Sequence, residues 1–147
     1  MPFGKWESRF LEVAELASHW SKNPKAKVGA VVVDAQGQIA GVGYNGFPKL
    51  VEDSAERYGN VETKLKMVVH AEENAILGAG VRARGDSIYV FGKPVCARCA
   101  GTIIQAGVGL VVARKPKKGT KSKWDKSDQI ARKMLKEANI TFVPISN

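Results

Sequence analysis

Stretches with helical periodicity and short apolar runs alternate along the chain. In residues 5–21, Trp6, Phe10 and Val13 fall on one helical face, and Asn23-Pro24 is expected to end that helix. The same criteria predict further helices within residues 68–80, 96–106 and 127–138. Short runs rich in Val and Ile predict strands over residues 27–33, 38–44, 87–91, 110–113 and 140–144.

The order of these elements predicts an α/β fold. A turn at residues 34–37 joins the first two strands into an antiparallel hairpin. A helix separates each of the last three strands from the next, which permits parallel pairing through right-handed crossovers. We therefore expect a three-layer α-β-α arrangement, with a five-stranded mixed sheet and helices on both faces. Because the chain has 147 residues and shows no repeat or linker, residues 1–147 are expected to form a single domain.

Residues 45–63 do not fit either periodicity. The stretch is polar and has few apolar positions, so we interpret it as a loop. A loop of this length inside a compact domain is usually a functional segment or a wrong assignment.

Composition narrows the class of protein. A hydrophobic content of 44% and a charged content of 25% are typical of a soluble globular domain. No apolar run is long enough to span a bilayer, and the first residues do not resemble a signal peptide, so we expect a cytoplasmic protein without a membrane partner. Two cysteines in a C-x-x-C sequence favour a metal or redox site in a reducing compartment.

The positive charge of the chain is concentrated in one segment. The net charge is +9, and residues 113–136 hold ten basic and two acidic residues, which gives +8 there and +1 elsewhere. Such a segment can bind a polynucleotide or attract an anionic mononucleotide, and it can also be a solvated or inter-subunit surface. Its one aromatic residue, Trp124, offers little for base stacking, so a nucleic-acid partner is possible but not favoured.

Two polar clusters at predicted helix starts carry the candidate chemistry. Cys96 and Cys99 are three residues apart in the first turn of one helix, where free N–H groups favour the thiolate. His70 opens the preceding helix and would complete three ligands, the pattern of a catalytic zinc with an open position. Glu72, which is not needed as a ligand, could move protons beside a metal-bound water. The remaining histidine, His19, is interpreted as structural or exposed.

Taken together, these clusters match a known signature. The order H-x-E followed by P-C-x-x-C is that of the zinc deaminases, although Val95 stands where the signature has Pro, and Pro94 is displaced by one position. A thioredoxin-type redox pair at Cys96 and Cys99 is the alternative, but it would leave Glu72 without a role.

The chain resembles the deoxycytidylate (dCMP) deaminases over residues 10–142. The resemblance rests on Gly43-Tyr-Asn-Gly-Phe-Pro48, His70-Ala-Glu-Glu-Asn-Ala-Ile76 and Cys96-Ala-Arg-Cys99. The long connection from Asn45 to His70 separates the chain from tRNA adenosine deaminases. The helix before the last strand separates it from cytidine deaminases that act on free nucleosides.

The resemblance implies a cytidine-deaminase-like fold and hydrolysis of dCMP to dUMP with release of ammonia. It implies that a zinc ion is held by His70, Cys96 and Cys99, and that Glu72 carries protons. It further implies an oligomer, a dimer or hexamer of identical chains. The residues that it implies for substrate binding are Ala71 for the pyrimidine oxygen, Asn45 for the deoxyribose hydroxyl, Lys25 and Lys27 for the 5′-phosphate and Trp124 for the base or sugar.

Three alternatives remain open. The substrate could be guanine, a modified dCMP, or a base within RNA or single-stranded DNA. The chain could instead be a non-catalytic zinc or nucleic-acid-binding module, which the presence of Glu72 argues against. Trp124 could pack the basic segment against the protein without contacting a nucleotide.

The loop after Pro48 bears on whether nucleotides regulate the activity. Many dCMP deaminases are controlled by deoxynucleoside triphosphates beside the G-Y-N-G-x-P loop, where a glycine follows the proline. Leu50 stands in that region here, and we expect a leucine not to adopt the positive φ that glycine allows. Weak or absent triphosphate regulation is therefore predicted.

Overall fold

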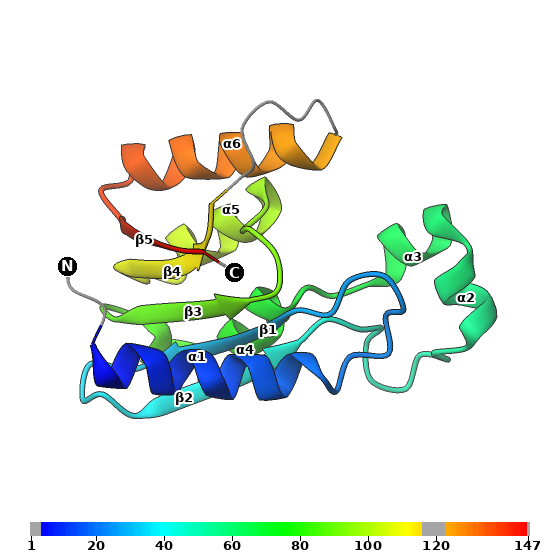
Figure 1. Ribbon diagram of the computed structural model, residues 1–147, viewed down its shortest axis with the longest axis horizontal. Coiled ribbons are helices and arrows are strands. Elements are labelled where there is room, and N and C mark those ends of the chain that lie inside the picture. Colours follow the sequence, from blue (N-terminus) through cyan, green and yellow to red (C-terminus); the bar gives the residue numbers. More distant parts are fainter. Residues whose placement is uncertain (1–3, 116–122, 147) are drawn as a thin grey trace.

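The chain folds around one five-stranded mixed sheet (Figure 1). The computed structural model describes residues 4–115 and 123–146, with the side chains of residues 126–146 only in the second range. Strand order is β2-β1-β3-β4-β5, in which β1 pairs antiparallel with β2 and β3, and the pairs β3–β4 and β4–β5 are parallel. The strands are β1 Gly29–Val33, β2 Ile39–Tyr44, β3 Ser87–Phe91, β4 Leu110–Arg114 and β5 Thr141–Ile145. The predicted mixed sheet is confirmed.

Helices cover both faces of the sheet. On one face, Phe10 and Ala14 of α1 (Lys5–Ser18) pack against Val31 and Val33. On the other face, the alternate residues of β1 pack with α4 (Ala71–Ala79), α5 (Ala97–Gln105) and α6 (Lys123–Glu137). This is the predicted three-layer arrangement, because strand residues that alternate in direction supply a separate apolar core to each layer.

Helix α4 lies unusually close to β2. A Cβ atom built on Gly41 would lie 2.1 Å from the carbonyl oxygen of Ala75, and one built on Gly43 would lie 2.3 Å from the carbonyl oxygen of Ala71. Both distances are far below a van der Waals contact, so only glycine fits at these two positions. The first turn of α4 is therefore held against the end of β2.

The interpretation of residues 45–63 as a loop was wrong for its second half. Two short helices, α2 (Ala55–Gly59) and α3 (Val61–Met67), lie there, at one end of the molecule beyond the sheet (Figure 1). They begin at capping residues, since Ser54 Oγ accepts from Arg57 N and Asn60 Oδ1 accepts from Thr63 N. Tyr58 is their buried residue, so no apolar stripe signals a helix.

Helix boundaries differ from the prediction at two places. Helix α1 ends at Ser18, three residues earlier than expected, and residues 19–21 continue with bonds of the tighter three-residue type. Helix α6 begins at Lys123, four residues earlier than expected. Among the described residues, no helix is both long enough and apolar enough to span a membrane.

The expectation for Leu50 was also wrong. Leu50 has φ 70° and a fully exposed side chain. Val51 N donates to Pro48 O at 3.1 Å, so Leu50 occupies the third position of a four-residue turn, where a type II turn needs positive φ. Leucine therefore takes the conformation expected of glycine at a cost of about 1–2 kcal/mol. Weak triphosphate regulation no longer follows from the backbone conformation at Leu50 and stays a prediction.

Replacement of Gly43 by alanine tests the close contact of α4 with β2. We expect Gly43→Ala to lower the free energy of unfolding by about 1–3 kcal/mol, because the new methyl group forces α4 away from the sheet. Gly59→Ala is the matched control, since a Cβ there meets no atom within 4 Å. Urea unfolding followed by circular dichroism measures both variants, and equal midpoints for the two would contradict the interpretation.

Candidate active site

The starts of two helices bring one nitrogen and two sulfur atoms together. His70 immediately precedes α4, Cys96 immediately precedes α5, and Cys99 lies in the first turn of α5. His70 Nδ1 is 3.2 Å from Cys99 Sγ and 3.4 Å from Cys96 Sγ. These ligand atoms all lie within 4.8 Å of one another. The three residues predicted as metal ligands therefore form one cluster.

The protonation equilibria of the cluster place a thiolate at Cys96. Hydrogen bonds from Cys99 and from His70 lower the pKa of the Cys96 thiol to about 4. The same Cys96 sulfur, by accepting a hydrogen bond, raises the pKa of His70, and the pKa of Cys99 is raised beside it. One imidazole nitrogen and two cysteine sulfurs are donors that zinc prefers. Among the described residues the cluster has three ligands, so tetrahedral coordination would keep one position open.

Glu72 lies beside this cluster and is almost completely buried. Burial raises the pKa of its carboxyl group to about 7, and Cys99 and His70 are among the groups that act on it. Its side chain belongs to the first turn of α4, two residues after His70. A carboxyl group that titrates near neutral pH can both accept and donate a proton, which is the property required of a general acid–base residue.

The first N–H groups of α4 belong to residues next to His70. Ala71 is the first residue of α4 and is fully buried. The first N–H groups of a helix have no partner within the helix, and they favour an electronegative atom. The predicted contact of the Ala71 N–H with a pyrimidine oxygen is compatible with this position and stays a prediction.

The loop that carries Asn45 runs alongside His70. Gly46 and Val69 exchange backbone hydrogen bonds at 3.1 and 2.8 Å, one residue before His70. The Asn45 side chain is buried, with Oδ1 accepting from Val28 N at 2.9 Å and Nδ2 donating to Ala26 O at 2.8 Å. Each group of the carboxamide keeps one further hydrogen-bonding position. Asn45 thus ties residues 26–28 to the ligand cluster.

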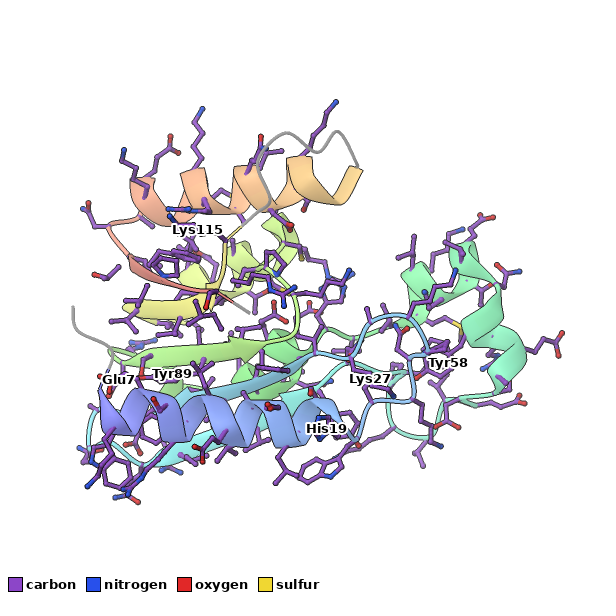
Figure 2. The ribbon with its side chains drawn as sticks, in the orientation of Figure 1. Glu7, His19, Lys27, Tyr58, Tyr89 and Lys115 are labelled. Carbon is purple, nitrogen blue, oxygen red and sulfur yellow. The ribbon has the colours of Figure 1, made fainter. Side chains whose placement is uncertain are left out.

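The lysines before β1 differ in their partners. Lys22 Nζ is 2.8 Å from Asp53 Oδ2, and Lys27 Nζ donates to the carbonyl oxygen of Ser21. Lys25 is exposed. Figure 2 shows Lys27 and Tyr58 at the end of the molecule where α2 and α3 lie. The ammonium groups of Lys25 and Lys27 are thus not used in ion pairs with the acidic residues described around them, whereas that of Lys22 is.

The structure describes the side chain of His19 but not that of Trp124. His19 is exposed at the end of α1 and is not part of the ligand cluster, as expected (Figure 2). Trp124 belongs to α6, but its side chain lies outside the described part of the chain. The same holds for much of the basic segment, including Lys117, Lys118 and Lys121. Their proposed contacts with a nucleotide stay predictions.

Sequence reasoning missed a residue that supports the cluster. Ser127 of α6 accepts a hydrogen bond from the N–H of Ala97, the residue after Cys96, at 2.9 Å. The hydroxyl thereby caps α5 from a neighbouring helix. A serine in a predicted helix start is a signal for a cap of its own helix, and nothing in the sequence indicates that it caps another.

Comparison with known proteins gives the family. The sequence matches the profile described as "Cytidine and deoxycytidylate deaminase zinc-binding region" over residues 4–115. An Aliivibrio fischeri protein described as "Uncharacterized deaminase in luxG 3'region" is 38% identical over 143 residues, covering 96% of this chain and 95% of that protein. Human deoxycytidylate deaminase is 35% identical over 146 residues, covering 94% of this chain and 78% of the human protein.

A solved structure of a deaminase has a similar fold. The crystal structure of dCMP deaminase from the cyanophage S-TIM5 in complex with dCMP and dUMP has a TM-score of 0.72 and 25% sequence identity to this chain. The match covers 95% of this chain and 96% of the phage chain.

Replacement of Ser127 tests the cap on α5. We expect Ser127→Ala to lower the free energy of unfolding by about 1 kcal/mol, because the N–H of Ala97 loses its acceptor. Ser127→Thr keeps a hydroxyl and should retain most of the stability. Thermal unfolding measures the difference, and an Ala variant as stable as the wild type would show that water replaces the cap without cost.

Proposed function

Because the chain belongs to the cytidine and deoxycytidylate deaminase family, we propose that it hydrolyses dCMP to dUMP and ammonia with zinc as its cofactor. One observation carries the proposal: His70, Cys96 and Cys99 form a compact donor set, and the buried carboxyl group of Glu72 lies beside it. A hydrolytic deaminase needs both a metal site and a proton carrier, and here both lie at the start of α4 and α5.

The choice of dCMP rests on relatives and on the Asn45 loop. The human relative is a deoxycytidylate deaminase, and the phage structure contains dCMP and dUMP. In this chain, Asn45 lies where the loop meets His70, and Lys25 and Lys27 lie on the segment that Asn45 binds. An amide for the sugar hydroxyl and ammonium groups for the phosphate suit a mononucleotide.

His70, Cys96 and Cys99 would hold the metal ion. When bound there, zinc supplies the Lewis acidity that makes a water molecule nucleophilic near neutral pH. Glu72 accepts one proton from the attacking water and delivers it to ring nitrogen N3; it then accepts the second proton from the new hydroxyl group and delivers it to the leaving amino group, so the ring carbon gains a carbonyl oxygen and loses ammonia. The N–H of Ala71 binds the pyrimidine oxygen and orients the ring.

Asn45 and the lysines orient the rest of the nucleotide. The free positions on the Asn45 carboxamide bind the deoxyribose hydroxyl. Lys27 keeps two ammonium protons besides the one donated to Ser21 O, and these protons, with Lys25, bind the 5′-phosphate. Trp124 covers the base or sugar from α6.

A second candidate is deamination of a base within RNA or single-stranded DNA. The observation that favours it is the charge of +8 over residues 113–136. Turnover of a short oligonucleotide, with no turnover of dCMP, would replace the first proposal by this one.

Assembly, compartment and domain structure complete the proposal. We expect residues 1–147 to act as one domain in a dimer or hexamer of identical chains. Exposed apolar side chains after α1 and on β2, with Trp20 and Tyr44 54% and 41% exposed, support self-association. A metal site built from free cysteines supports function in a reducing compartment such as the cytoplasm.

Glu72→Gln tests the proton carrier. We expect ammonia release from dCMP to fall by at least about 100-fold, since glutamine cannot transfer the proton, while zinc content stays near that of the wild type. Glu62→Gln changes an exposed carboxylate of α3 and serves as the control. Ammonia release and metal analysis of purified protein give both readouts. Substantial activity in Glu72→Gln would assign the proton transfer to another group.

The paired substitution Lys25→Ala/Lys27→Ala tests phosphate binding. We expect KM for dCMP to rise roughly tenfold or more, because charged hydrogen bonds to the phosphate are lost, while turnover of deoxycytidine changes little. Lys22→Ala is the matched control, because its ammonium group is already paired with Asp53. An equal loss with dCMP and deoxycytidine would count against the phosphate assignment.

A further inference from the structure

The side chain of Arg98 connects α5 to the start of α4. Arg98 Nη2 lies 2.6 Å from Glu73 Oε1, and Arg98 Nε lies 3.2 Å from Glu73 Oε2, so guanidinium and carboxylate meet at two points. Arg98 Nη2 also donates to the carbonyl oxygen of Val68 at 3.2 Å. Arg98 lies between the two cysteines in sequence, and Glu73 follows Glu72. Two residues that supply no ligand thus join the two elements that supply all three ligands.

Glu73 extends this connection to His70. Its Oε1 atom, which accepts from Arg98, also accepts from the main-chain N–H of His70 at 3.0 Å. Arg98 therefore holds the main chain at two points close to the imidazole in sequence. It binds Val68 directly, and it binds His70 through Glu73. The backbone that carries the nitrogen ligand is tied to the helix that carries the sulfur ligands.

Such a tie matters because the ligands belong to separate elements. No covalent bond joins His70 to Cys96 or Cys99, and the nitrogen lies within 3.4 Å of both sulfurs. A shift of α4 relative to α5 by roughly 1 Å would take His70 Nδ1 outside the narrow distance range of a shared metal ion without unfolding either helix. The spacing between the two helix starts is therefore the quantity that the site must fix.

We propose that the Arg98–Glu73 ion pair is a positioning device, which holds His70 at the two cysteines and slows release of the metal ion. This inference rests on the zinc site of the proposed function. Arg98 and Glu73 act through the ligands and touch neither metal nor substrate. Removal of groups that orient metal ligands commonly lowers metal affinity ten- to hundredfold.

Exposure separates this role from a contribution to overall stability. The side chains of Arg98 and Glu73 are 50% and 20% exposed, and an ion pair whose cation is half open to solvent adds little to the free energy of unfolding. The Arg82–Asp34 pair is a matched control, because Arg82 Nη2 and Nε approach Asp34 Oδ2 at 2.6 and 3.1 Å and the Arg82 side chain is 53% exposed. Arg82 follows the opposite end of α4, away from the ligands.

The test compares zinc release from the full-length, zinc-loaded wild type and its variants into an excess of a chromogenic chelator. We expect Arg98→Gln to release zinc roughly ten- to hundredfold faster than the wild type. Arg98→Lys should be intermediate, because it keeps the charge but loses the planar fork. Glu73→Gln keeps an acceptor for the His70 N–H and loses the ion pair, so it should also release zinc faster. Arg82→Gln should match the wild type.

Two further measurements exclude a purely structural effect. Unfolding midpoints of the metal-free Arg98→Gln and Arg82→Gln variants should be similar. With cobalt(II) in place of zinc, the visible absorption bands report ligand geometry, and they should change in Arg98→Gln but not in Arg82→Gln.

An Arg98→Gln variant that releases zinc at the wild-type rate would overturn the proposal. If its KM for dCMP is raised while the rate of zinc release is unchanged, Arg98 would instead be assigned to substrate binding. If Arg98→Gln does not fold, the release rates of Arg98→Lys and Glu73→Gln decide in the same way. A wild-type chain that binds no zinc refutes the metal site itself. Zinc binding without dCMP turnover refutes only the substrate of the proposed function.

Discussion

Helix α4 packs against β2 at a distance that only glycine permits. Without Cβ atoms at Gly41 and Gly43, the carbonyl oxygens of Ala75 and Ala71 lie directly over the strand. This contact fixes the first turn of α4 at the end of β2, where Asn45 follows. The histidine that precedes the helix and the loop that follows the strand therefore share one place, and the remaining parts of the site are arranged around it.

Helix starts provide most of the chemistry at that place. The starts of α4 and α5 converge. Their unpaired N–H groups and their dipoles favour an anionic sulfur and an oxygen atom of a bound molecule. Burial acts in the opposite direction on Glu72 and raises the pKa of its carboxyl group to about 7. The same small region therefore holds a thiolate at Cys96 and, at Glu72, a carboxyl group that titrates near neutral pH. Ser127 of α6 caps the start of α5, and the Arg98–Glu73 pair joins the start of α5 to that of α4.

Much of the site was predictable because its residues are close in sequence. His70 and Glu72 are two residues apart at one helix start. Cys96 and Cys99 are three residues apart at another, and this helical spacing directs both sulfurs toward one spot. The contacts of Ser127, Arg98 and the lysines were not predictable, because their partners are 25 or more residues away or are main-chain atoms. Helices α2 and α3 were missed because they bury little apolar surface and so show no amphipathic pattern.

The sequence by itself determined the class of fold, the order of the strands and of the helices that cover the sheet, and the donor set of the candidate metal site. Periodicity and motif spacing encode these features locally, so they do not depend on distant contacts. The tertiary structure decided which lysines stay unpaired, how close α4 approaches the sheet, and that Leu50 adopts positive φ in its turn. Those features depend on atoms that the fold brings together from separate segments, and a local pattern contains no record of such distances.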